Sequence, residues 1–434
     1  MLISRRQLLG AMAAGAFAQS RRPNVVILFA DDMGWGDVGF NGRKDWDTPN
    51  LDRLAAQGTV FERWYTAFPV CAPSRASLLT GRYTIHNTVR SNGVDLPAGE
   101  VTIAEALKPL GYKSALIGKW HRGQGRGNEP GYTHPLEQGF DYTFGYLDAI
   151  HAWEHFPKML FRGREEVPVK GYSSDILVDD AIKWIGENKA NPFFLYLPFI
   201  EPHFHIEAPE EDVSRYKGKF KEKDPNEPVN ARYAAMVHRL DKSIGRLLKS
   251  LDEQGLSGNT IVVFTADNGA TFETGNKGAS AYHDSNRPFR GQKRSLEEGG
   301  IREPGVVRWP GRVPAGKRSQ VPVHNIDLMP TLVAAAGGSV DPAWKVDGAN
   351  MLDAWMGKSP GPERTLFWEL ENQSGWTMYA AMRGDFKVLQ MGPNRFLYNV
   401  ATDRGERRTL GAEYPEVLKG LTGELQDWLK TAVR

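Results

Sequence analysis

Four short, continuous apolar runs stand out from the mixed polar sequence around them. Runs of this length that are rich in β-branched and aromatic residues are typical of strands buried on both faces of a parallel sheet. The sequence therefore predicts four such strands, at Asn24 to Ala30, Tyr112 to Gly118, Pro192 to Ile200 and Thr260 to Ala266.

Polar residues follow each of these runs directly. They are Asp31 and Asp32, Lys119 and His121, Glu201 and His203, and Asp267 and Asn268. Open α/β sheets bind their ligands in the crevice at the carboxyl ends of the strands. We therefore expect these four segments to meet there.

Helical patterns alternate with the strands, at Leu51 to Gln57, Ile103 to Leu110, Ser174 to Asn188 and Tyr233 to Gln254. This alternation predicts an α/β fold with a large doubly wound, mostly parallel sheet in a catalytic domain over residues 23–338. After a stretch rich in Pro and Gly, the pattern changes to short alternating runs and a final helix from Pro415 to Thr431. Residues 339–434 should form a C-terminal subdomain, a small antiparallel sheet with one helix and few catalytic duties.

Composition excludes several classes of partner. The chain has 434 residues, of which 41% are hydrophobic and 24% charged, so it can bury a large core. Its net charge is only +2, which argues against a nucleic acid or a membrane surface as partner.

The first 18 residues look like a bacterial twin-arginine export signal. Arg5 and Arg6 precede an apolar run, Leu8 to Ala18, that is too short to span a bilayer and ends in a small-residue cleavage pattern. The alternative is an ordinary Ala-rich first helix. We expect recognition by the export machinery, removal of residues 1–18, and a periplasmic or secreted protein without a membrane attachment.

Cys71 is the only cysteine, so it cannot form a disulfide within the chain. It opens a segment in which Pro73 suits the first turn of a helix and Gly81 suits its C-terminal cap. Cys71 would then lie at the positive end of that helix. A small buried apolar residue and a redox thiol are alternative interpretations, but neither explains Pro73, Ser74 and Arg75.

Six motifs occur in the order of the formylglycine-dependent sulfatases, which belong to the alkaline-phosphatase-like superfamily, and the chain resembles that family over nearly its whole mature length. They are Ala30-Asp31-Asp32-Met33-Gly34-Trp35-Gly36-Asp37, Cys71-Ala72-Pro73-Ser74-Arg75, Gly118-Lys119-Trp120-His121, Glu201-Pro202-His203, Thr265-Ala266-Asp267-Asn268-Gly269, and Gly291-Gln292-Lys293 before Glu298-Gly299-Gly300. The stretch from Ser285 to Phe289 is more similar to glycan and N-acetylgalactosamine-type sulfatases than to aryl-selective ones. The resemblance implies that the substrate is a small-molecule or oligosaccharide sulfate ester.

The resemblance also implies that Cys71 is converted to formylglycine by a separate maturation enzyme. The hydrate of this aldehyde carries two hydroxyls on one carbon. One attacks sulfur to form a covalent sulfo-enzyme, and deprotonation of the other then expels sulfate, which divides a difficult displacement into two easier steps.

Asp31, Asp32, Asp267 and Asn268 offer only oxygen ligands, so they favour a hard cation such as Ca²⁺, with Mg²⁺ or Mn²⁺ as alternatives. The family resemblance adds the modified Cys71 to this set. Such a cation would polarise a sulfate oxygen and lower the pKa of the hydrate. The alternative is that these polar pairs cap the turns after their strands.

The resemblance assigns further roles around the sulfate. Arg75, Lys119 and Lys293 would surround formylglycine and the sulfate oxygens. His203 would protonate the leaving oxygen, and His121 would take the proton that collapses the sulfated hydrate. Asp267 could assist the first attack, and His283, which lies near Lys293 in the sequence, is a candidate substrate-binding residue.

Two other functions fit the same residues. A formylglycine enzyme that prefers phosphonate monoesters or phosphodiesters would use the same cation and cationic side chains. A pseudoenzyme that binds a sulfated glycan without turnover is the other alternative, although every motif position is intact.

Overall fold

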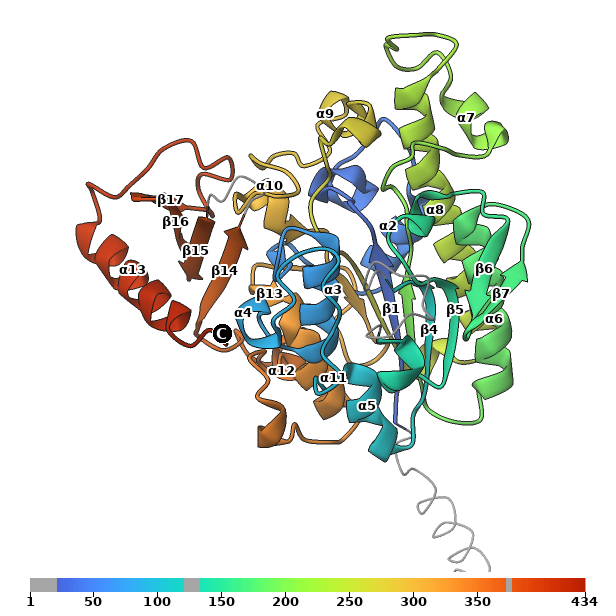
Figure 1. Ribbon diagram of the computed structural model, residues 1–434, viewed down its shortest axis with the longest axis horizontal. Helices are drawn as coiled ribbons and strands as arrows, with labels where there is room; N and C mark the ends of the chain where they lie inside the picture. The colour runs from blue at the N-terminus through green and yellow to red at the C-terminus, as the bar shows by residue number, and fades with distance from the viewer. Residues whose placement is uncertain (1–21, 121–132, 372–376, 434) are drawn as a thin grey trace, which may run out of the picture.

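The computed structural model describes residues 22–120, 133–371 and 377–433. A large part on the right of Figure 1 is built around one long sheet, and a smaller part on the left contains the C-terminal strands. The strands of the long sheet are β1 (Asn24–Ala30), β2 (Thr59–Phe61), β4 (Lys113–Lys119), β5 (Tyr142–Tyr146), β6 (Met159–Arg162), β7 (Glu165–Pro168), β8 (Phe193–Pro198), β9 (Thr260–Ala266), β11 (Val306–Arg308) and β12 (Lys317–Ser319).

The long sheet has the strand order β12-β2-β11-β9-β1-β8-β4-β5-β6-β7. Its centre, β9-β1-β8-β4-β5, is parallel, and the antiparallel pairings lie toward the two edges. The four strands predicted from apolar runs are β1, β4, β8 and β9, and the mostly parallel sheet is confirmed. Every residue of β1, β8 and β9 is buried, which explains their continuous apolar sequences.

Helices cover both faces of this sheet (Figure 1). Val26 and Leu28 of β1 pack in one core with α2 (Pro49–Ala56), α6 (Ser173–Asn188), α7 (Glu210–Tyr216) and α8 (Val229–Glu253). Val25 and Ile27 face the opposite core, which contains α3 (Cys71–Thr80), α5 (Ile103–Leu107), α11 (Leu328–Ala335) and α12 (Leu352–Trp355). Shorter helices are α4 (Thr84–Asn87), α9 (Ala279–Tyr282) and α10 (Glu298–Ile301). The doubly wound arrangement is therefore confirmed.

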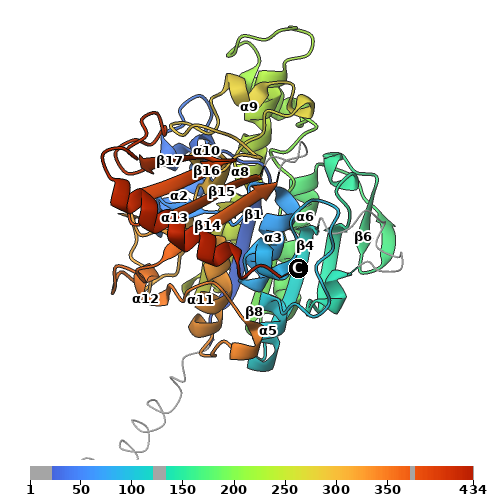
Figure 2. The ribbon, with the colours of Figure 1, turned by 60° about the vertical axis from the view of Figure 1, so that its left-hand side comes forward.

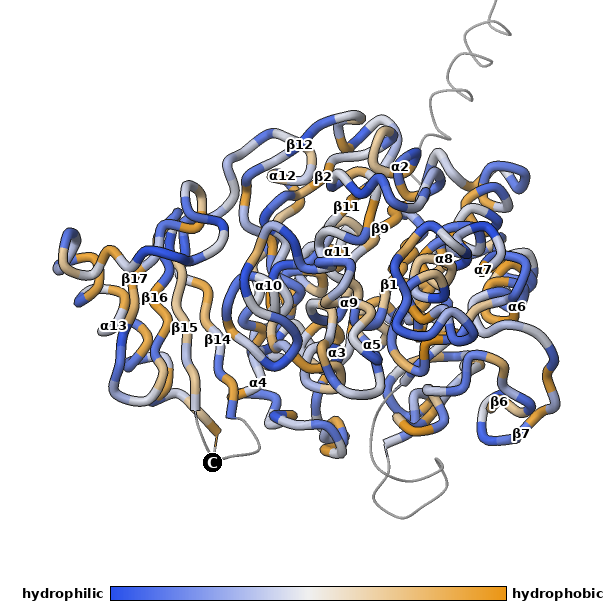
Figure 3. The backbone as a smooth tube through the Cα atoms, turned by 90° about the horizontal axis from the view of Figure 1, so that it is seen from above, coloured by the Kyte–Doolittle hydropathy of each residue, from blue (hydrophilic) through white to orange (hydrophobic). Residues whose placement is uncertain are grey.

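The C-terminal part is a four-stranded antiparallel sheet with one helix (Figure 2). Its elements are β14 (Thr365–Glu371), β15 (Thr377–Arg383), β16 (Phe386–Met391), β17 (Asn394–Asn399) and α13 (Pro415–Leu429). One face of the sheet packs on Tyr65 and Ile301 of the large part, and the other packs on α13 through Leu421 and Leu425. Figure 3 shows hydrophobic residues concentrated on these strands and on the central strands of the long sheet.

A second small sheet has the strand order β10-β3-β13, and its residue Tyr65 packs against the C-terminal strands. Its strands are β3 (Trp64–Tyr65), β10 (Arg302–Glu303) and β13 (Val323–His324). Packing also continues across residue 338, because Met351 and Trp355 belong to the core under the long sheet. The predicted division at residues 338 and 339 thus stays a prediction. Within the described ranges, no helix is long and apolar enough to cross a membrane.

Candidate active site

Four adjacent parallel strands bring the predicted polar segments to one edge of the sheet. Asp31 and Asp32 follow β1, and Asp267 and Asn268 follow its neighbour β9. Lys119 is the last residue of β4, and Glu201 to His203 lie in the turn after β8. Side chains from segments more than 200 residues apart therefore meet at the carboxyl ends of the strands, as open α/β sheets require of a ligand site.

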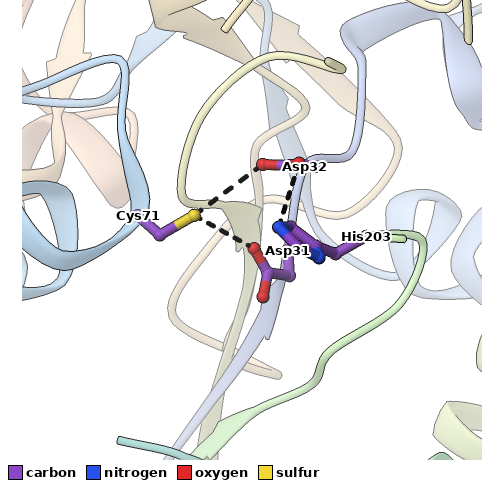
Figure 4. Close-up of side chains that lie close together, drawn as sticks. All are labelled: Asp31, Asp32, Cys71 and His203. Carbon is purple, nitrogen blue, oxygen red and sulfur yellow. Dashed lines mark hydrogen bonds and ion pairs between the residues drawn. The ribbon is translucent and has the colours of Figure 1, made fainter. Parts of the chain in front are cut away.

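Cys71 is the first residue of α3 and is fully buried. Gly81 ends this helix in the left-handed conformation, with φ 68°. The Cys71 Sγ lies 3.4 Å from Asp31 Oδ1 and 3.8 Å from Asp32 Oδ1 (Figure 4). Burial raises the pKa of the Cys71 thiol well above its usual value, although the positive charges of Lys293 and Lys119 oppose the shift. The unmodified thiol is therefore neutral and a poor nucleophile.

Two of the carboxylates, those of Asp31 and Asp32, lie close to Cys71 and His203. Ligand atoms of Asp31, Asp32, Cys71 and His203 lie within 4.8 Å of one another. Asn268 Nδ2 donates to Asp32 Oδ1 at 2.7 Å, whereas the buried Asn268 Oδ1 has no hydrogen-bond partner among the described residues. A buried amide oxygen beside paired carboxylates is suited to a hard divalent cation.

The three carboxylates differ in their pKa. Burial favours a higher pKa for Asp31, but the charges of Lys119, His203 and Arg75 hold it well below its usual range. Burial raises the pKa of Asp32 against the opposing charge of Lys293. Burial and the negative charge of Asp31 raise the pKa of Asp267 to about 7. A bound cation would lower all three values, because it stabilises the ionised forms.

Three buried cations surround this cluster. Arg75 Nη2 lies 2.7 Å from Asp267 Oδ2 and 3.4 Å from Asp31 Oδ2. The Lys119 ammonium donates to Asp31 Oδ2. The Lys293 ammonium lies 2.9 Å from Asp32 Oδ2. The structure therefore brings the three predicted cationic residues together, and each of them pairs with a carboxylate of the cluster.

His203 lies against Asp32, with 3.6 Å between His203 Nε2 and Asp32 Oδ2. Its Nδ1 is 2.7 Å from the Phe204 carbonyl oxygen, and since a carbonyl only accepts, Nδ1 carries the proton of that hydrogen bond. Burial lowers the pKa of His203 well below its usual value, helped by Lys293 and Lys119, although Asp31 opposes the shift. The Nε2 atom is thus held toward the site and can exchange a proton there.

Two of the predicted site residues are not part of this cluster as described. His121 lies outside the described residues, and its role stays a prediction. His283 is held in the core beneath α9, where its Nε2 bonds the Asn230 carbonyl at 3.0 Å and its ring contacts Trp46 and Tyr233. These packing contacts are sufficient to account for the burial of His283. Substrate binding by His283 stays a prediction.

A cavity of about 440 Å³ reaches the cluster. Two cluster residues, His203 and Lys293, contribute to its wall. The other lining residues are Asn92, Gly93, Asp148, Ala149, Ile150, Trp153, Phe204, Glu273 and Arg294. This volume falls in the range of roughly 300–1,000 Å³ that is usual for small-ligand sites.

Two acidic residues near the cluster were not predicted from the sequence. Glu273 lies 3.3 Å from the Lys293 ammonium, and although burial opposes it, the charges of Lys293 and Arg294 lower the pKa of Glu273 to about 2. Glu303 on β10 is fully buried, and neither of its carboxyl oxygens has a hydrogen-bond partner within the described residues. Burial, with Asp267 and Asp32, raises the pKa of Glu303 well above its usual range. No local pattern marks either residue, because the groups around them come from distant segments.

Comparison with known proteins agrees with this geometry. The family model Sulfatase matches residues 23–339. N-acetylgalactosamine-6-sulfatase of Canis lupus familiaris is 33% identical over 417 residues, which cover 88% of this chain and 74% of that protein.

Solved structures show the same fold. The crystal structure of Ps i-CgsB in complex with k-i-k-neocarrahexaose has a TM-score of 0.83 and 31% identity, covering 94% of this chain and 93% of that one. The phosphonate monoester hydrolase of Agrobacterium radiobacter shares the fold with a TM-score of 0.71 at 21% identity, covering 94% and 95%. The chain therefore belongs to the sulfatase family and is an enzyme that hydrolyses sulfate esters, with Cys71 in the buried acidic cluster of its active site.

Proposed function

We propose that this sulfatase releases sulfate from sulfated carbohydrates, using formylglycine made from Cys71 and a bound divalent cation. The observation that carries the proposal is the position of Cys71, at the N-terminus of α3 with its Sγ directed at Asp31 and Asp32. The raised pKa of the buried thiol argues against a thiolate nucleophile. Formylglycine supplies, once hydrated, a hydroxyl that attacks sulfur and a second hydroxyl whose deprotonation releases sulfate.

Asp31, Asp32, Asp267 and Asn268 would hold the cation. The unpaired Asn268 Oδ1 and the carboxylate oxygens form a donor set that suits Ca²⁺ best, with Mg²⁺ or Mn²⁺ as alternatives. When bound, the cation polarises a sulfate oxygen and acidifies the formylglycine hydrate.

The remaining side chains bind the sulfate and move protons. Lys119 pairs with Asp31, and Lys293 pairs with Asp32. Their positive charges would stabilise the negative charge that develops on the oxygens as the S–O bond breaks. Arg75, anchored on Asp267, orients the first turn of α3 that carries Cys71. His203, when protonated on both ring nitrogens, would deliver the Nε2 proton to the leaving alcohol oxygen and return to the neutral form with its proton on Nδ1. The matching base for the second step is proposed to be His121.

A carbohydrate is favoured as the leaving alcohol for two reasons. The cavity wall combines the aromatic rings of Trp153 and Phe204, whose centroids are 5.4 Å apart, with the polar side chains of Asn92 and Asp148. Aromatic faces and polar groups together suit the apolar and hydroxyl faces of a sugar. A similar protein is an N-acetylgalactosamine-6-sulfatase, and a similar solved structure is a complex with k-i-k-neocarrahexaose.

The test is sulfate release by the matured enzyme from defined sulfated sugars. The panel contains galactose 6-sulfate and the 4- and 6-sulfates of N-acetylgalactosamine, each beside its phosphate ester. We expect kcat/KM to be higher for at least one sugar sulfate than for its phosphate counterpart. Preference for phosphate esters throughout would instead support a phosphonate monoesterase or phosphodiesterase, and tight binding without turnover would support a glycan-binding pseudoenzyme.

Export through the twin-arginine route is a separate part of the proposal, since residues 1–18 lie outside the described residues. The supporting feature is Arg5-Arg6 before a short apolar run. In a bacterial host, replacing both arginines with lysine should leave the protein in the cytoplasm, whereas the natural sequence should deliver it to the periplasm. Equal distribution of the two proteins would contradict this route.

A further inference from the structure

A second cavity of about 740 Å³ adjoins the catalytic one. Glu273 lines both cavities. The turn after it, Thr274–Asn276, packs on the catalytic side so closely that a Cβ on Gly275 would lie 2.7 Å from the Phe204 ring. The second cavity is therefore reached directly from the wall of the first.

Two exposed aromatic residues, Phe272 and Tyr282, line the second cavity. Their exposed fractions are 45% and 47%, which is high for large apolar side chains. Tyr282 is held in place, because its hydroxyl accepts a hydrogen bond from the Lys221 backbone N–H at 2.9 Å and its ring meets the edge of Phe220. Tyr282 thus presents a fixed aromatic face to the cavity.

Four acidic side chains line this cavity, and one of them, Asp224, makes no ion pair with a described residue but accepts from the Asn226 backbone N–H at 2.8 Å. Glu222 accepts from the first backbone N–H groups of α8, at Asn230 and Ala231. Glu227 pairs with Lys277, and Glu273 pairs with Lys293 and Arg294.

Two lysines of the same wall, like Asp224, have no ion-pair partner among the described residues. Lys221 and Lys223 make no ion pair with any described residue. The cavity therefore presents aromatic faces together with lysine and carboxylate side chains that can hydrogen-bond, a combination that suits a hydroxyl-rich sugar chain.

We propose that this second cavity, which we call the outer subsite, binds the sugar residues next to the one whose sulfate ester enters the Cys71 site. The substrate class is then a sulfated oligosaccharide, with Phe272 and Tyr282 as specificity-determining residues that stack on sugar rings. This inference rests on the proposed function, because it assumes a carbohydrate leaving group. In Figure 1, α9, which carries Tyr282, lies near the end of the molecule where β1 finishes.

The test compares substrates of different length. Sulfate release is measured from N-acetylgalactosamine 6-sulfate, from tetrasaccharides of chondroitin 6-sulfate and ι-carrageenan, and from 4-methylumbelliferyl sulfate. We expect wild-type kcat/KM to be higher for a tetrasaccharide than for the monosaccharide. The double variant Phe272→Ala/Tyr282→Ala should lower the tetrasaccharide value about tenfold, through KM, while changing the other two less than about twofold.

Two variants serve as controls. Tyr282→Phe keeps the ring and should keep the tetrasaccharide preference. Tyr414→Ala removes an aromatic residue of similar exposure, 45%, from the C-terminal part, and should change nothing. A double variant that loses activity equally on all substrates, or a wild type without length preference, overturns the outer subsite alone. Hydrolysis of only the aryl sulfate overturns the carbohydrate proposal and the subsite together.

Discussion

Lys387 on β16 is a fully buried lysine whose ammonium lies between two buried glutamates. Lys387 Nζ is 2.9 Å from Glu298 Oε1 and 3.0 Å from Glu406 Oε1, and all three side chains have no exposed surface. Glu298 also accepts from the Tyr65 hydroxyl at 2.9 Å and from Arg302 at 3.1 Å. The network joins the C-terminal sheet to α10, five residues after the active-site residue Lys293.

Replacing Lys387 with methionine should destabilise the protein strongly. The alkyl stem is kept, so little cavity forms, but the two glutamates lose the charge between them. Removing one partner of a buried ion pair costs about 3–5 kcal/mol, because the remaining charge stays buried without compensation. We expect the free energy of unfolding to fall by an amount in that range.

Urea unfolding at neutral pH measures this loss. The double variant Lys387→Met/Glu406→Gln should be more stable than Lys387→Met alone by at least about 1 kcal/mol, because Glu298 keeps Arg302 and Tyr65. As a control, Lys430→Met removes an exposed pair with Asp427 and should change stability by less than about 0.5 kcal/mol. The reasoning fails if Lys387→Met loses less than about 1 kcal/mol, or if the second substitution adds a further loss.

Three further predictions concern the active site. Cys71→Ala should lower kcat by roughly 10⁴-fold or more while leaving the urea unfolding curve nearly unchanged, and substantial turnover by the purified variant would contradict the nucleophile assignment. Asn268→Leu removes a proposed oxygen ligand of the proposed Ca²⁺, so the Ca²⁺ concentration for half-maximal activity should rise by about tenfold or more, and an unchanged titration would exclude Asn268 as a ligand. Asp267 has its pKa raised by burial from 3.8 to about 7, above its unfolded value, so the folded metal-free protein binds the extra proton and loses stability as the pH rises from about 4 to about 7. Urea unfolding with a chelator should show this loss relative to Asp267→Asn, and parallel pH profiles of the two proteins would refute it.

The central strands were predictable because burial on both faces leaves a local mark in the sequence. The strand predicted at Asn24 to Ala30 has those bounds in the structure, as does the strand at Thr260 to Ala266. Helix α8 starts at Val229 rather than at Tyr233, because Glu222 accepts from the N–H groups of its first turn. A helix start that depends on a side chain seven residues upstream has no local sequence signal.

The short strands could not be predicted for the opposite reason. Strands β2, β3 and β10–β13 have two or three residues each, too few for any periodicity, and their partners lie far away in the sequence. Among the short alternating runs of the C-terminal part, the chain turns between β15 and β16 at Gly384, which adopts φ 58°. The strand pairing, not the hydropathy, fixes that turn.

The candidate site was predictable where its polar residues come directly after a buried strand. Asp31 and Asp267 are placed by their covalent attachment to two parallel neighbours, β1 and β9, so the sheet alone brings them together. Glu273 and Glu303 depend instead on how loops fold over the sheet. Glu273 pairs with Lys293, which lies 20 residues later in the chain, and no sequence spacing predicts that contact.

The most direct test of the central claim is peptide mass spectrometry of the Cys71 peptide from enzyme that is releasing sulfate. The account predicts that the active fraction carries formylglycine at position 71, detected as the mass of an aldehyde in place of the thiol. Fully active enzyme in which position 71 is unmodified cysteine would contradict it.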